Sequence, residues 1–484
     1  MVFKNFKYPV LAEYFEKISS IPRMSYHEEK IAEYLVGFAK ERGLECYTDG
    51  ANNVLINLPA SEGCDNAEPL LFQGHTDMVC EKNSGAAHDF LNEGLELYEE
   101  DGYLKARGTT LGADDGVAVA VMLALIDGGA SSHPACQFLF TSAEEVGLDG
   151  AKAFDYSRIF ARKMINMDGA DENFLIVGCA GGVRSDAHFS ITRRAPSFDT
   201  ILKISLGGLM GGHSGENIGD GRANANKLAG EQLRRIYRST DTELIAFDGG
   251  TKDNAIPREA VLLVSVKDGE CARGTAEEFE AKIKRSLAKD DLGFFISCEN
   301  YDGEEAPLVF SSADTERIIS FVSSVENGVL KMSDKIDGLV EFSRNLGIVR
   351  TDAEGIDFYF SSRSAIEEQL EASMARIETL AKELCGEVKH YNRYPGWEVS
   401  GRSPLADEYI DAAKRLFGTE VYKTALHAGL ECGIVKKAVP DIEIISCGPD
   451  VRDLHSPDER LDIASFERFF AVIKEVTESI ARKK

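Results

Sequence analysis

The chain of 484 residues is too long for one ordinary hydrophobic core, so we expect two or more domains. Acidic residues number 81 against 54 basic ones, which gives a formal net charge of -27 at pH 7. Such a surface repels phosphate, and this argues against nucleic acid or an anionic membrane as a partner. With 43% hydrophobic and 28% charged residues, the composition is typical of a soluble globular protein.

Cysteine use and hydropathy both point to the cytoplasm. The ten cysteines are scattered without a C-x-x-C spacing, which favours core thiols in a reducing compartment over a disulfide scaffold. No apolar segment is long enough to cross a bilayer, and the N-terminus lacks a signal-peptide pattern.

The first third of the chain alternates helices with short strands. An apolar stripe predicts a helix over residues 9–20, and Ser25 with Glu28 has the spacing of a capping box for a second helix. A near-continuous apolar run at residues 117–126 predicts a buried helix, and residues 81–107 read as a loop or small ribbon. Strands are expected at residues 54–58, 70–72, 136–141 and 164–167.

Polar residues follow these strands directly. His75 and Asp77 come after the second strand, and residues i and i+2 of a strand share a face. The pair can therefore aim an imidazole at a metal while the carboxylate orients it. A lone His-x-Asp pair is more often a surface hydrogen bond, but acidic residues also follow the later strands.

Two acidic pairs, Asp114-Asp115 and Glu144-Glu145, suggest a metal centre. Adjacent carboxylates repel unless a cation lies between them or one stays protonated, although on a solvated helix face such a pair means little. One carboxylate can bridge two divalent ions about 3.5–4 Å apart. Histidine and carboxylate ligands favour zinc, with manganese or cobalt also compatible. An acid beside a ligand, as Glu144 is beside Glu145, can take a proton from water.

The middle of the chain has a different character and a faint internal repeat. Asn254 precedes an apolar run and the acidic pair at Glu277 by 23 residues (277 minus 254). Asn345 precedes another run and the acidic pair at Glu367 by 22 residues (367 minus 345). Two copies of one β-α unit would explain this spacing, and chance similarity stays open.

Helices and strands alternate again after residue 397, and His455 lies in a polar turn after the strand expected at 442–446. A loop histidine is usually solvent-exposed, but few other candidates exist for a last ligand. We therefore predict an α/β protein whose mixed-sheet domain is built from residues 1–182 and 392–484, with an inserted α+β domain over residues 183–391. The site is expected at the carboxyl edge of the strands.

Seven segments in chain order resemble the bacterial aminoacyl-histidine dipeptidases (Xaa-His dipeptidase, peptidase D), within the two-zinc aminopeptidase-like clan. They are GHTDMV (residues 74–79), LGADDG (111–116), TSAEEVG (141–147), NMDG (166–169), GGHSG (211–215), HAGLECG (427–433) and HSPDE (455–459). The resemblance covers essentially the whole chain. It implies a two-zinc catalytic domain with an inserted lid, and hydrolysis of carnosine-type Xaa-His and other dipeptides.

The resemblance also implies a ligand for each metal position. His75 and Asp168 would hold one zinc, Glu145 and His455 the other, and Asp114 would bridge them.

Further roles follow for neighbours of these ligands. Asp77 would brace His75, and Glu144 would be the general base and then carry the proton to the leaving amine. Relatives have a cis bond after the bridging aspartate. Many of them have Asn at the next position, where this chain has Asp115, so an extra negative charge could alter metal binding.

In the inserted domain, His213 resembles a donor to the tetrahedral oxyanion, with an ordinary flexible-loop histidine as the alternative. Asn254 and Arg363 resemble residues that grip the substrate's backbone and terminal carboxylate, since the planar guanidinium pairs both oxygens. A surface salt bridge is the alternative for Arg363. The HAGLECG motif places Gly429 at the substrate and makes Glu431 a candidate partner of its free amine.

Other readings stay open. A related hydrolase of the clan (a tripeptidase, aminoacylase or carboxypeptidase) would differ mainly in the inserted domain. An inactive peptide-binding relative should lack the base or a ligand, whereas this chain keeps all of them. A homodimer through the inserted domain is a further option.

Overall fold

The middle of the chain forms a unit of its own in the computed structural model, which describes residues 6–303 and 307–483. The first unit comprises Met1–Gly178, Trp397–Ala425 and Leu430–Lys484, and the second comprises Cys179–Gly396 and Leu426–Gly429. The predicted boundaries were residues 182 and 391. The sequence did not indicate that the short segment Leu426–Gly429 belongs with the middle unit.

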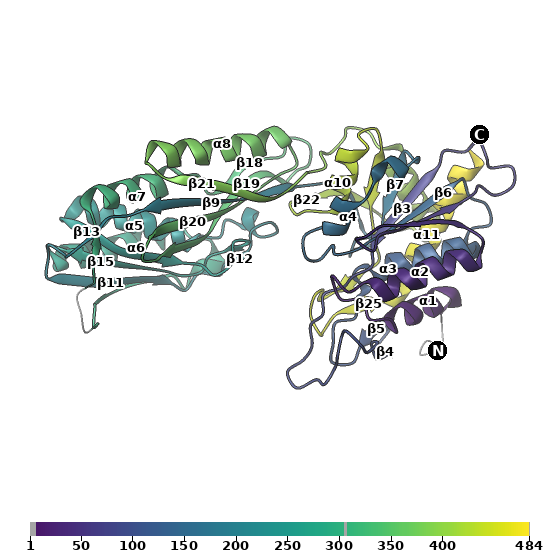
Figure 1. Ribbon diagram of the computed structural model, residues 1–484, viewed down its shortest axis with the longest axis horizontal. Helices are drawn as coiled ribbons and strands as arrows, with labels where there is room; N and C mark the ends of the chain where they lie inside the picture. Colours follow the sequence, from purple (N-terminus) through teal and green to yellow (C-terminus); the bar gives the residue numbers. More distant parts are fainter. Residues whose placement is uncertain (1–5, 304–306, 484) are drawn as a thin grey trace. The chain divides into compact units, whose positions relative to one another are not determined.

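The first unit is built on an eight-stranded sheet with the order β1-β2-β6-β3-β7-β23-β8-β22 (Figure 1). Its strands are β1 (Glu45–Thr48), β2 (Val54–Leu58), β3 (Leu70–His75), β6 (Cys136–Thr141), β7 (Lys163–Asn166), β8 (Phe174–Cys179), β22 (Tyr422–Leu426) and β23 (Glu443–Ser446). The four neighbours β6, β3, β7 and β23 run parallel. Their carboxyl ends therefore meet at one edge of the sheet.

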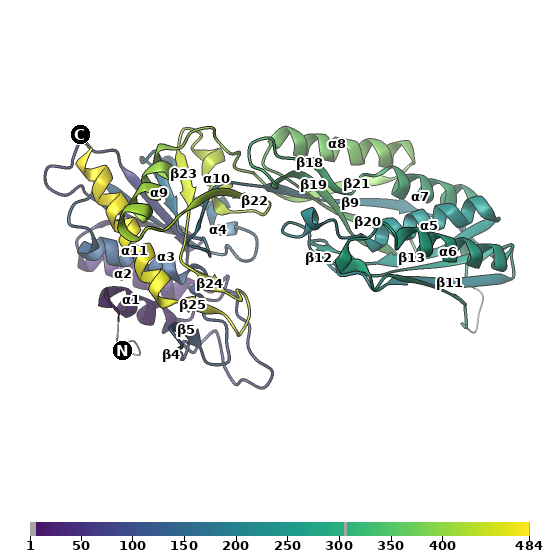
Figure 2. The ribbon, with the colours of Figure 1, turned by 180° about the vertical axis from the view of Figure 1, so that it is seen from behind.

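Helices lie on both faces of this sheet. They are α1 (Pro9–Ser19), α2 (Glu29–Glu41), α3 (Ala113–Ala124), α4 (Asp149–Ala153), α9 (Pro404–Phe417), α10 (Glu431–Ala438) and α11 (Ile463–Arg482). Helices α1, α2, α3, α9 and α11 share a core with Phe72 and Phe138, whose stacked rings lie 5.2 Å apart. Figure 1 shows α4 and α10 on the other side of the sheet, and Figure 2 shows α9 beside α11. The predicted mixed α/β fold is confirmed.

The predicted capping box at the start of the second helix is wrong. Helix α2 begins at Glu29 without a side-chain cap. The Ser25 hydroxyl instead donates to Asp77 at 2.7 Å, and Glu28 accepts the backbone N–H of Ala143 at 2.9 Å. Both side chains thus brace the strand-end loops, which is a tertiary role that shares the local signature of a cap.

A small sheet with the order β24-β25-β5-β4 joins two distant segments of the first unit. Its strands are β4 (Leu97–Glu100), β5 (Tyr103–Ala106), β24 (Val451–Arg452) and β25 (Arg460–Asp462), so a ribbon does form within residues 81–107. Leu461 of β25 lies opposite Leu104 of β5. The loop that carries His455 is therefore anchored to the hairpin that precedes α3.

The second unit has an antiparallel sheet with the order β16-β11-β15-β13-β19-β20-β9-β21, and β18 also pairs with β19. The strands are β9 (Gly181–Ser190), β11 (Thr200–Gly207), β13 (Thr242–Gly249), β15 (Ala260–Val266), β16 (Phe295–Asn300), β18 (Gly328–Met332), β19 (Val340–Thr351), β20 (Gly355–Ser364) and β21 (Glu387–Tyr394). The helices are α5 (Ala225–Ser239), α6 (Gly269–Ile283), α7 (Ser312–Ser324) and α8 (Glu367–Glu383). Figure 1 shows these helices along one face of the sheet.

The order of strands is symmetric about the centre of the second sheet. The internal repeat stays a prediction, because Glu277 lies within α6 whereas Glu367 begins α8. Read from the outer edge to the centre, β16-β11-β15-β13 corresponds to β21-β9-β20-β19, with α5 and α6 matching α7 and α8. Since β9 precedes the first half in the chain, that half is inserted after the first strand of the second. The two asparagines of the sequence pattern are not equivalent, because Asn254 lies in a loop and Asn345 lies within β19.

Short elements complete the fold. A two-stranded ribbon pairs β10 (Arg193–Arg194) with β17 (Val309–Phe310), and another pairs β12 (Gly212–His213) with β14 (Ala255–Ile256). Helix α3 continues into a wider turn at Leu125–Gly129. In the described ranges, no helix has the length and the apolar content that a bilayer crossing requires.

Two glycines allow neighbouring strand-end loops of the first unit to touch. The backbone N–H of Gly169, directly after Asp168, donates to the carbonyl oxygen of Cys447 at 3.1 Å. A Cβ on Gly448 would collide with the carbonyl oxygen of Gly169, and one on Gly169 would lie 2.6 Å from the carbonyl carbon of Cys447. A side chain at either position would therefore push these loops apart.

We expect Gly448→Ala to lower the free energy of unfolding by about 1–3 kcal/mol, because the added methyl group overpacks the loop contact. Gly37→Ala is the matched control: no atom lies within 4 Å of a Cβ placed there inside α2, so this change should stabilise the helix by up to about 1 kcal/mol. Denaturant unfolding of both variants measures the difference. Equal stability of Gly448→Ala and the unmodified chain would contradict the packing described.

Candidate active site

The parallel strands of the first unit bring polar side chains to one edge. His75 ends β3, Glu145 lies four residues after the end of β6, and Asp168 follows β7. Asp114 is in the first turn of α3, and His455 lies in the loop between β24 and β25. These five side chains all belong to the first unit.

Asp114 lies between the two histidines. Its Oδ1 is 2.9 Å from Nε2 of His75, and its Oδ2 is 3.1 Å from Nε2 of His455. The peptide bond between Asp114 and Asp115 is cis, as the resemblance implied. The carboxylate thus has one oxygen near each imidazole, an arrangement that would suit a bridging ligand.

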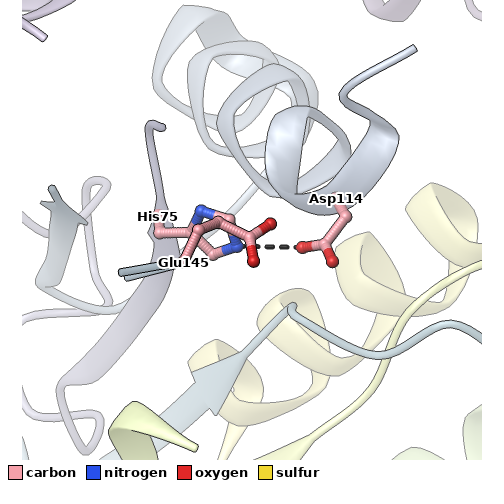
Figure 3. Close-up of side chains that lie close together, drawn as sticks. All are labelled: His75, Asp114 and Glu145. Atoms are coloured by element: carbon pink, nitrogen blue, oxygen red, sulfur yellow. Dashed lines mark hydrogen bonds and ion pairs between the residues drawn. The ribbon is translucent and has the colours of Figure 1, made fainter. Parts of the chain in front are cut away.

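Each histidine also approaches a second carboxylate. Nε2 of His75 is 3.8 Å from Oδ1 of Asp168, and Nε2 of His455 is 3.2 Å from Oε1 of Glu145. Ligand atoms of His75, Asp114 and Glu145 all lie within 4.8 Å of one another, and Figure 3 shows these three side chains converging. Oε1 of Glu145 is buried and has the His455 imidazole beside it, so a protonated imidazole or a bound cation can compensate its charge.

Asp115 braces the backbone instead of facing the histidines with Asp114. Its Oδ2 accepts the backbone N–H of His75 at 3.2 Å, and its Oδ1 accepts that of Ala118 at 3.4 Å. Burial raises the pKa of this carboxyl well above its ordinary value. One of its oxygens lies within 4.8 Å of ligand atoms of His75 and Asp168, which is close enough for the three side chains to hold a metal ion. A Cβ on Gly74 would lie 2.5 Å from Asp115 Oδ2, so the glycine before His75 is required here.

The charges of the site balance through the imidazoles. Burial alone would lower the pKa of His75, but its hydrogen bonds to Asp114 and Asp77 outweigh burial and raise the pKa well above the usual value. The hydrogen bond to Asp114 and the nearby Glu145 raise the pKa of His455 to about 10. The carboxylates thus demand positive charge, and divalent cations bound by this donor set would supply it.

Asp77 organises more than the His75 ring. Its carbonyl oxygen lies 3.1 Å from Nδ1 of His75 and its carboxylate lies 3.4 Å from the same nitrogen, which leaves Nε2 for a metal. The carboxylate also accepts the backbone N–H of Glu144 at 3.0 Å and of Glu145 at 3.2 Å. The predicted brace for one ligand therefore also holds the loop of another ligand and of the candidate base.

Glu144 lies in that loop, half-buried and beside Glu145. Burial, together with the neighbouring Glu431 and Glu145 carboxylates, raises the pKa of Glu144 well above its usual range. A carboxyl group with a raised pKa is suited to take a proton and release it again near neutral pH.

Glu431 is fully buried at the start of α10. Its Oε2 accepts from Nε2 of Gln73 at 2.5 Å and from the Thr141 hydroxyl at 2.6 Å, whereas Oε1 has no partner. Burial raises its pKa to about 7. The contacts are with β3 and β6, and the predicted role toward a substrate amine stays a prediction.

His213 and Asn254 are neighbours in the second unit. His213 in β12 pairs with Ala255 of β14, and the Ser214 N–H donates to the Asn254 carbonyl at 2.8 Å. Burial and the charge of Arg363 lower the pKa of His213. Since Nδ1 of the neutral ring accepts the backbone N–H of Glu216 at 3.3 Å, Nε2 carries the proton and is a donor.

Arg363 in β20 is only 6% exposed, so the surface salt bridge considered from the sequence is wrong. One guanidinium nitrogen donates to the Tyr394 hydroxyl at 2.9 Å, and Nε is buried without a partner. Within residues 6–303 and 307–483, no carboxylate forms an ion pair with Arg363. Burying a guanidinium without an opposite charge is costly, and an anion bound here would compensate it.

Residues 427–429 of the HAGLECG segment also belong to the second unit. His427 contacts the Ser343 hydroxyl at 2.7 Å, and burial together with the charge of Arg363 lowers its pKa to about 3. A Cβ on Gly429 would lie 2.7 Å from the ring of Tyr394, so the glycine makes room for that ring. Tyr394 lies outside the seven motifs, so the sequence offered no signal for its contact with Arg363.

Comparisons with known proteins agree with this geometry. Residues 71–479 match the model of Peptidase family M20/M25/M40. The chain belongs to this family. It is 35% identical over 476 residues to the cytosol non-specific dipeptidase of Escherichia coli, covering 98% of both chains. It also matches the crystal structure of aminoacylhistidine dipeptidase from Vibrio alginolyticus, with 32% identity, a TM-score of 0.92 and coverage of 98% and 97%.

A more distant match shows the fold alone. Aminopeptidase PepT from Bacillus cereus is 17% identical, with a TM-score of 0.57 over 99% of this chain and 100% of that one. The resemblance stated from the seven motifs is therefore confirmed, and the chain is a peptidase of this family.

We expect Glu144→Gln to lower kcat/KM by about 10²-fold or more, because the amide cannot take up a proton. Its metal content should not change, since Glu144 contacts neither histidine. Glu145→Gln is the control from the same loop, and it should lose metal as well as activity. Kinetics and elemental analysis of the two purified variants provide the comparison, and a fully active Glu144→Gln enzyme would refute the role of base.

Proposed function

We propose that the protein is a metal-dependent dipeptidase that hydrolyses the peptide bond of Xaa-His (carnosine-type) and other dipeptides. The observation that carries this proposal is the position of Asp114, with one carboxylate oxygen toward each histidine. The names of the Escherichia coli and Vibrio alginolyticus relatives support dipeptides as the substrate class.

Five residues would hold two divalent ions. We assign His75 and Asp168 to one ion, Glu145 and His455 to the other, and Asp114 to both. The imidazole and carboxylate donors and the short distances between their ligand atoms support the assignment. Zinc suits this donor set, with manganese and cobalt as alternatives. When bound, the two cations polarise the scissile carbonyl group and make a water molecule more acidic.

Glu144 handles the proton of the reaction. Its carboxylate takes a proton from the attacking water while the water oxygen bonds to the carbonyl carbon. The same group then gives a proton to the leaving nitrogen as the C–N bond breaks, so that one water is added across the peptide bond. Asp77 keeps Glu144 in place through the backbone N–H.

Residues of the second unit would recognise the substrate. Arg363 would bind the terminal carboxylate, because it is buried, unpaired and held by Tyr394. His213 would donate from Nε2 to the developing oxyanion, and Asn254 would bind the substrate backbone. Gly429 would lie near the substrate, and Glu431 would be the partner of its free amine.

Two alternatives deserve comparison. A tripeptidase, aminoacylase or carboxypeptidase would share the metal centre. A buried arginine that binds the carboxylate directly after the scissile bond argues against a tripeptidase that removes the first residue. The names of the two relatives favour dipeptides over the other two substrate classes. An inactive peptide-binding relative would lack the proposed base or one of the proposed ligands, whereas this chain has Glu144 and all five ligand residues.

Assembly and location remain predictions. Strand β16 is an outer strand of its sheet and exposes Phe295, which suits a homodimer through the second unit. The molar mass in solution distinguishes one copy from two. The Escherichia coli relative is named a cytosol enzyme, which supports the predicted cytoplasmic location.

We expect the purified enzyme to cleave Xaa-His and other dipeptides, to lose activity in a chelator and to regain it with zinc. N-acyl amino acids and tripeptides form the comparison panel, and mass spectrometry of the products identifies the bond that is cut. Preference for the tripeptides or the N-acyl substrates would favour the alternative hydrolases, and activity that survives complete metal removal would contradict the mechanism.

We expect Arg363→Ala to raise KM for a dipeptide by about 10-fold or more, since a hydrogen-bonded charge pair contributes about 1.5–3 kcal/mol. The KM for the matching dipeptide amide, which lacks the carboxylate, should change little. Arg350→Ala removes an exposed arginine of the same sheet and is the control. Equal increases for acid and amide substrates would show that Arg363 does not bind the carboxylate.

A further inference from the structure

We infer that Glu459 and Arg23 are positioning residues that together hold the Asp114 turn between the segments carrying His75 and His455. The inference rests on the proposed two-metal function and concerns two residues that had no predicted role. It explains how three segments from distant parts of the chain keep a fixed spacing.

Glu459 binds the turn that leads to Asp114 through four consecutive amides. Its Oε2 accepts the N–H of Leu111 at 2.9 Å and of Gly112 at 3.1 Å. Its Oε1 accepts the N–H of Ala113 at 2.8 Å and lies 3.5 Å from that of Asp114. Only 3% of Glu459 is exposed, so water does not compete for these bonds.

These amides are the ones that need an outside acceptor. They lie in the turn that leads into α3, where Asp114 and Asp115 are not helical, so the helix itself offers these N–H groups no partner. A carboxylate satisfies them with charge-assisted bonds. The Asp115 carboxylate does not serve these amides, because it accepts the N–H groups of Ala118 and His75.

The position of Glu459 in the chain couples this turn to His455. Both side chains come from the loop between β24 and β25, four residues apart. That loop is anchored where β25 pairs with β5, close to the turn itself in the chain. A shift of the loop would therefore move His455 and the support of Asp114 together.

Arg23 holds the same turn from the His75 side. Only 2% exposed, it donates through Nη1 to the carbonyl oxygens of Thr76 and Asp77, both at 3.0 Å. Its Nη2 donates to the carbonyl oxygen of Gly112. Gly112 thus has its N–H on Glu459 and its carbonyl group on Arg23, and a Cβ there would lie 2.5 Å from Arg23 Nη2.

The two charges compensate each other across the turn. In the described part of the chain, no carboxylate forms an ion pair with Arg23. Burial lowers its pKa, and Glu459 is the charge that opposes this lowering most. Loss of the Glu459 charge would therefore leave Arg23 buried without its main compensation.

The test is Glu459→Gln, whose amide cannot accept from all four N–H groups and presents an NH₂ group to some of them. We expect both zinc ions, which share Asp114, to bind at least 10-fold more weakly, as is typical when a group that orients a ligand is removed. Equilibrium dialysis with elemental analysis measures both binding steps, and kcat should fall more than KM rises.

Glu443→Gln is the matched control. Glu443 also accepts a helix N-terminal amide, that of Leu405 at 2.7 Å, together with the Ser403 hydroxyl at 2.7 Å. Both variants should lower the free energy of unfolding of the metal-free protein, but only Glu459→Gln should weaken metal binding. A purely structural role for Glu459 would leave the two variants alike.

The possible outcomes separate the inference from the function on which it rests. If the unmodified protein binds no pair of ions, the proposed function fails. If it binds two ions and Glu459→Gln binds both as tightly as the unmodified protein does, the positioning role is overturned. Should Glu459→Gln not fold, Glu459→Asp replaces it, and unchanged affinity for both ions in that variant would equally overturn the role.

Discussion

The site depends on the contact of one carboxylate with two imidazoles. Asp114 presents one oxygen to His75 and the other to His455, and the two histidines come from segments 380 residues apart (455 minus 75). Each imidazole also approaches a second carboxylate. Placing these acids together is electrostatically unfavourable unless positive charge lies between them, and either the imidazoles or bound cations can supply that charge.

Sheet topology explains how such distant residues meet. Strands β6, β3, β7 and β23 are parallel neighbours, and the loops that follow them all leave from the same edge. Gly169 and Gly448 let two of these loops touch. The loop that carries His455 does not follow one of these strands. It is held beside Asp114 by a separate small sheet, in which β25 pairs with β5.

Much of this arrangement was predictable from sequence, for physical reasons. The apolar runs that end in acidic or histidine residues marked the strand ends, and the chain order of seven motifs identified the family. Motifs report residue types at short spacing, however, and long-range contacts leave no local trace. Ser25 and Glu28 matched a capping box while in fact bracing Asp77 and Ala143. Tyr394, which holds Arg363, lies outside any motif.

The predicted repeat shows the same limit. Spacing suggested two β-α units in the second unit, but the place of β9 between β20 and β21 could be seen only from the strand order. The buried state of Arg363 also depended on tertiary packing, because the same Ser-Ser-Arg-Ser sequence could lie on an exposed strand.

The central claim is that Asp114 bridges two metal ions, and anomalous X-ray diffraction from crystals grown with zinc tests it most directly. Data collected above and below the zinc absorption edge should give two peaks about 3.5–4 Å apart, one beside each oxygen of Asp114. A single peak, or a pair of peaks away from Asp114, would contradict the account.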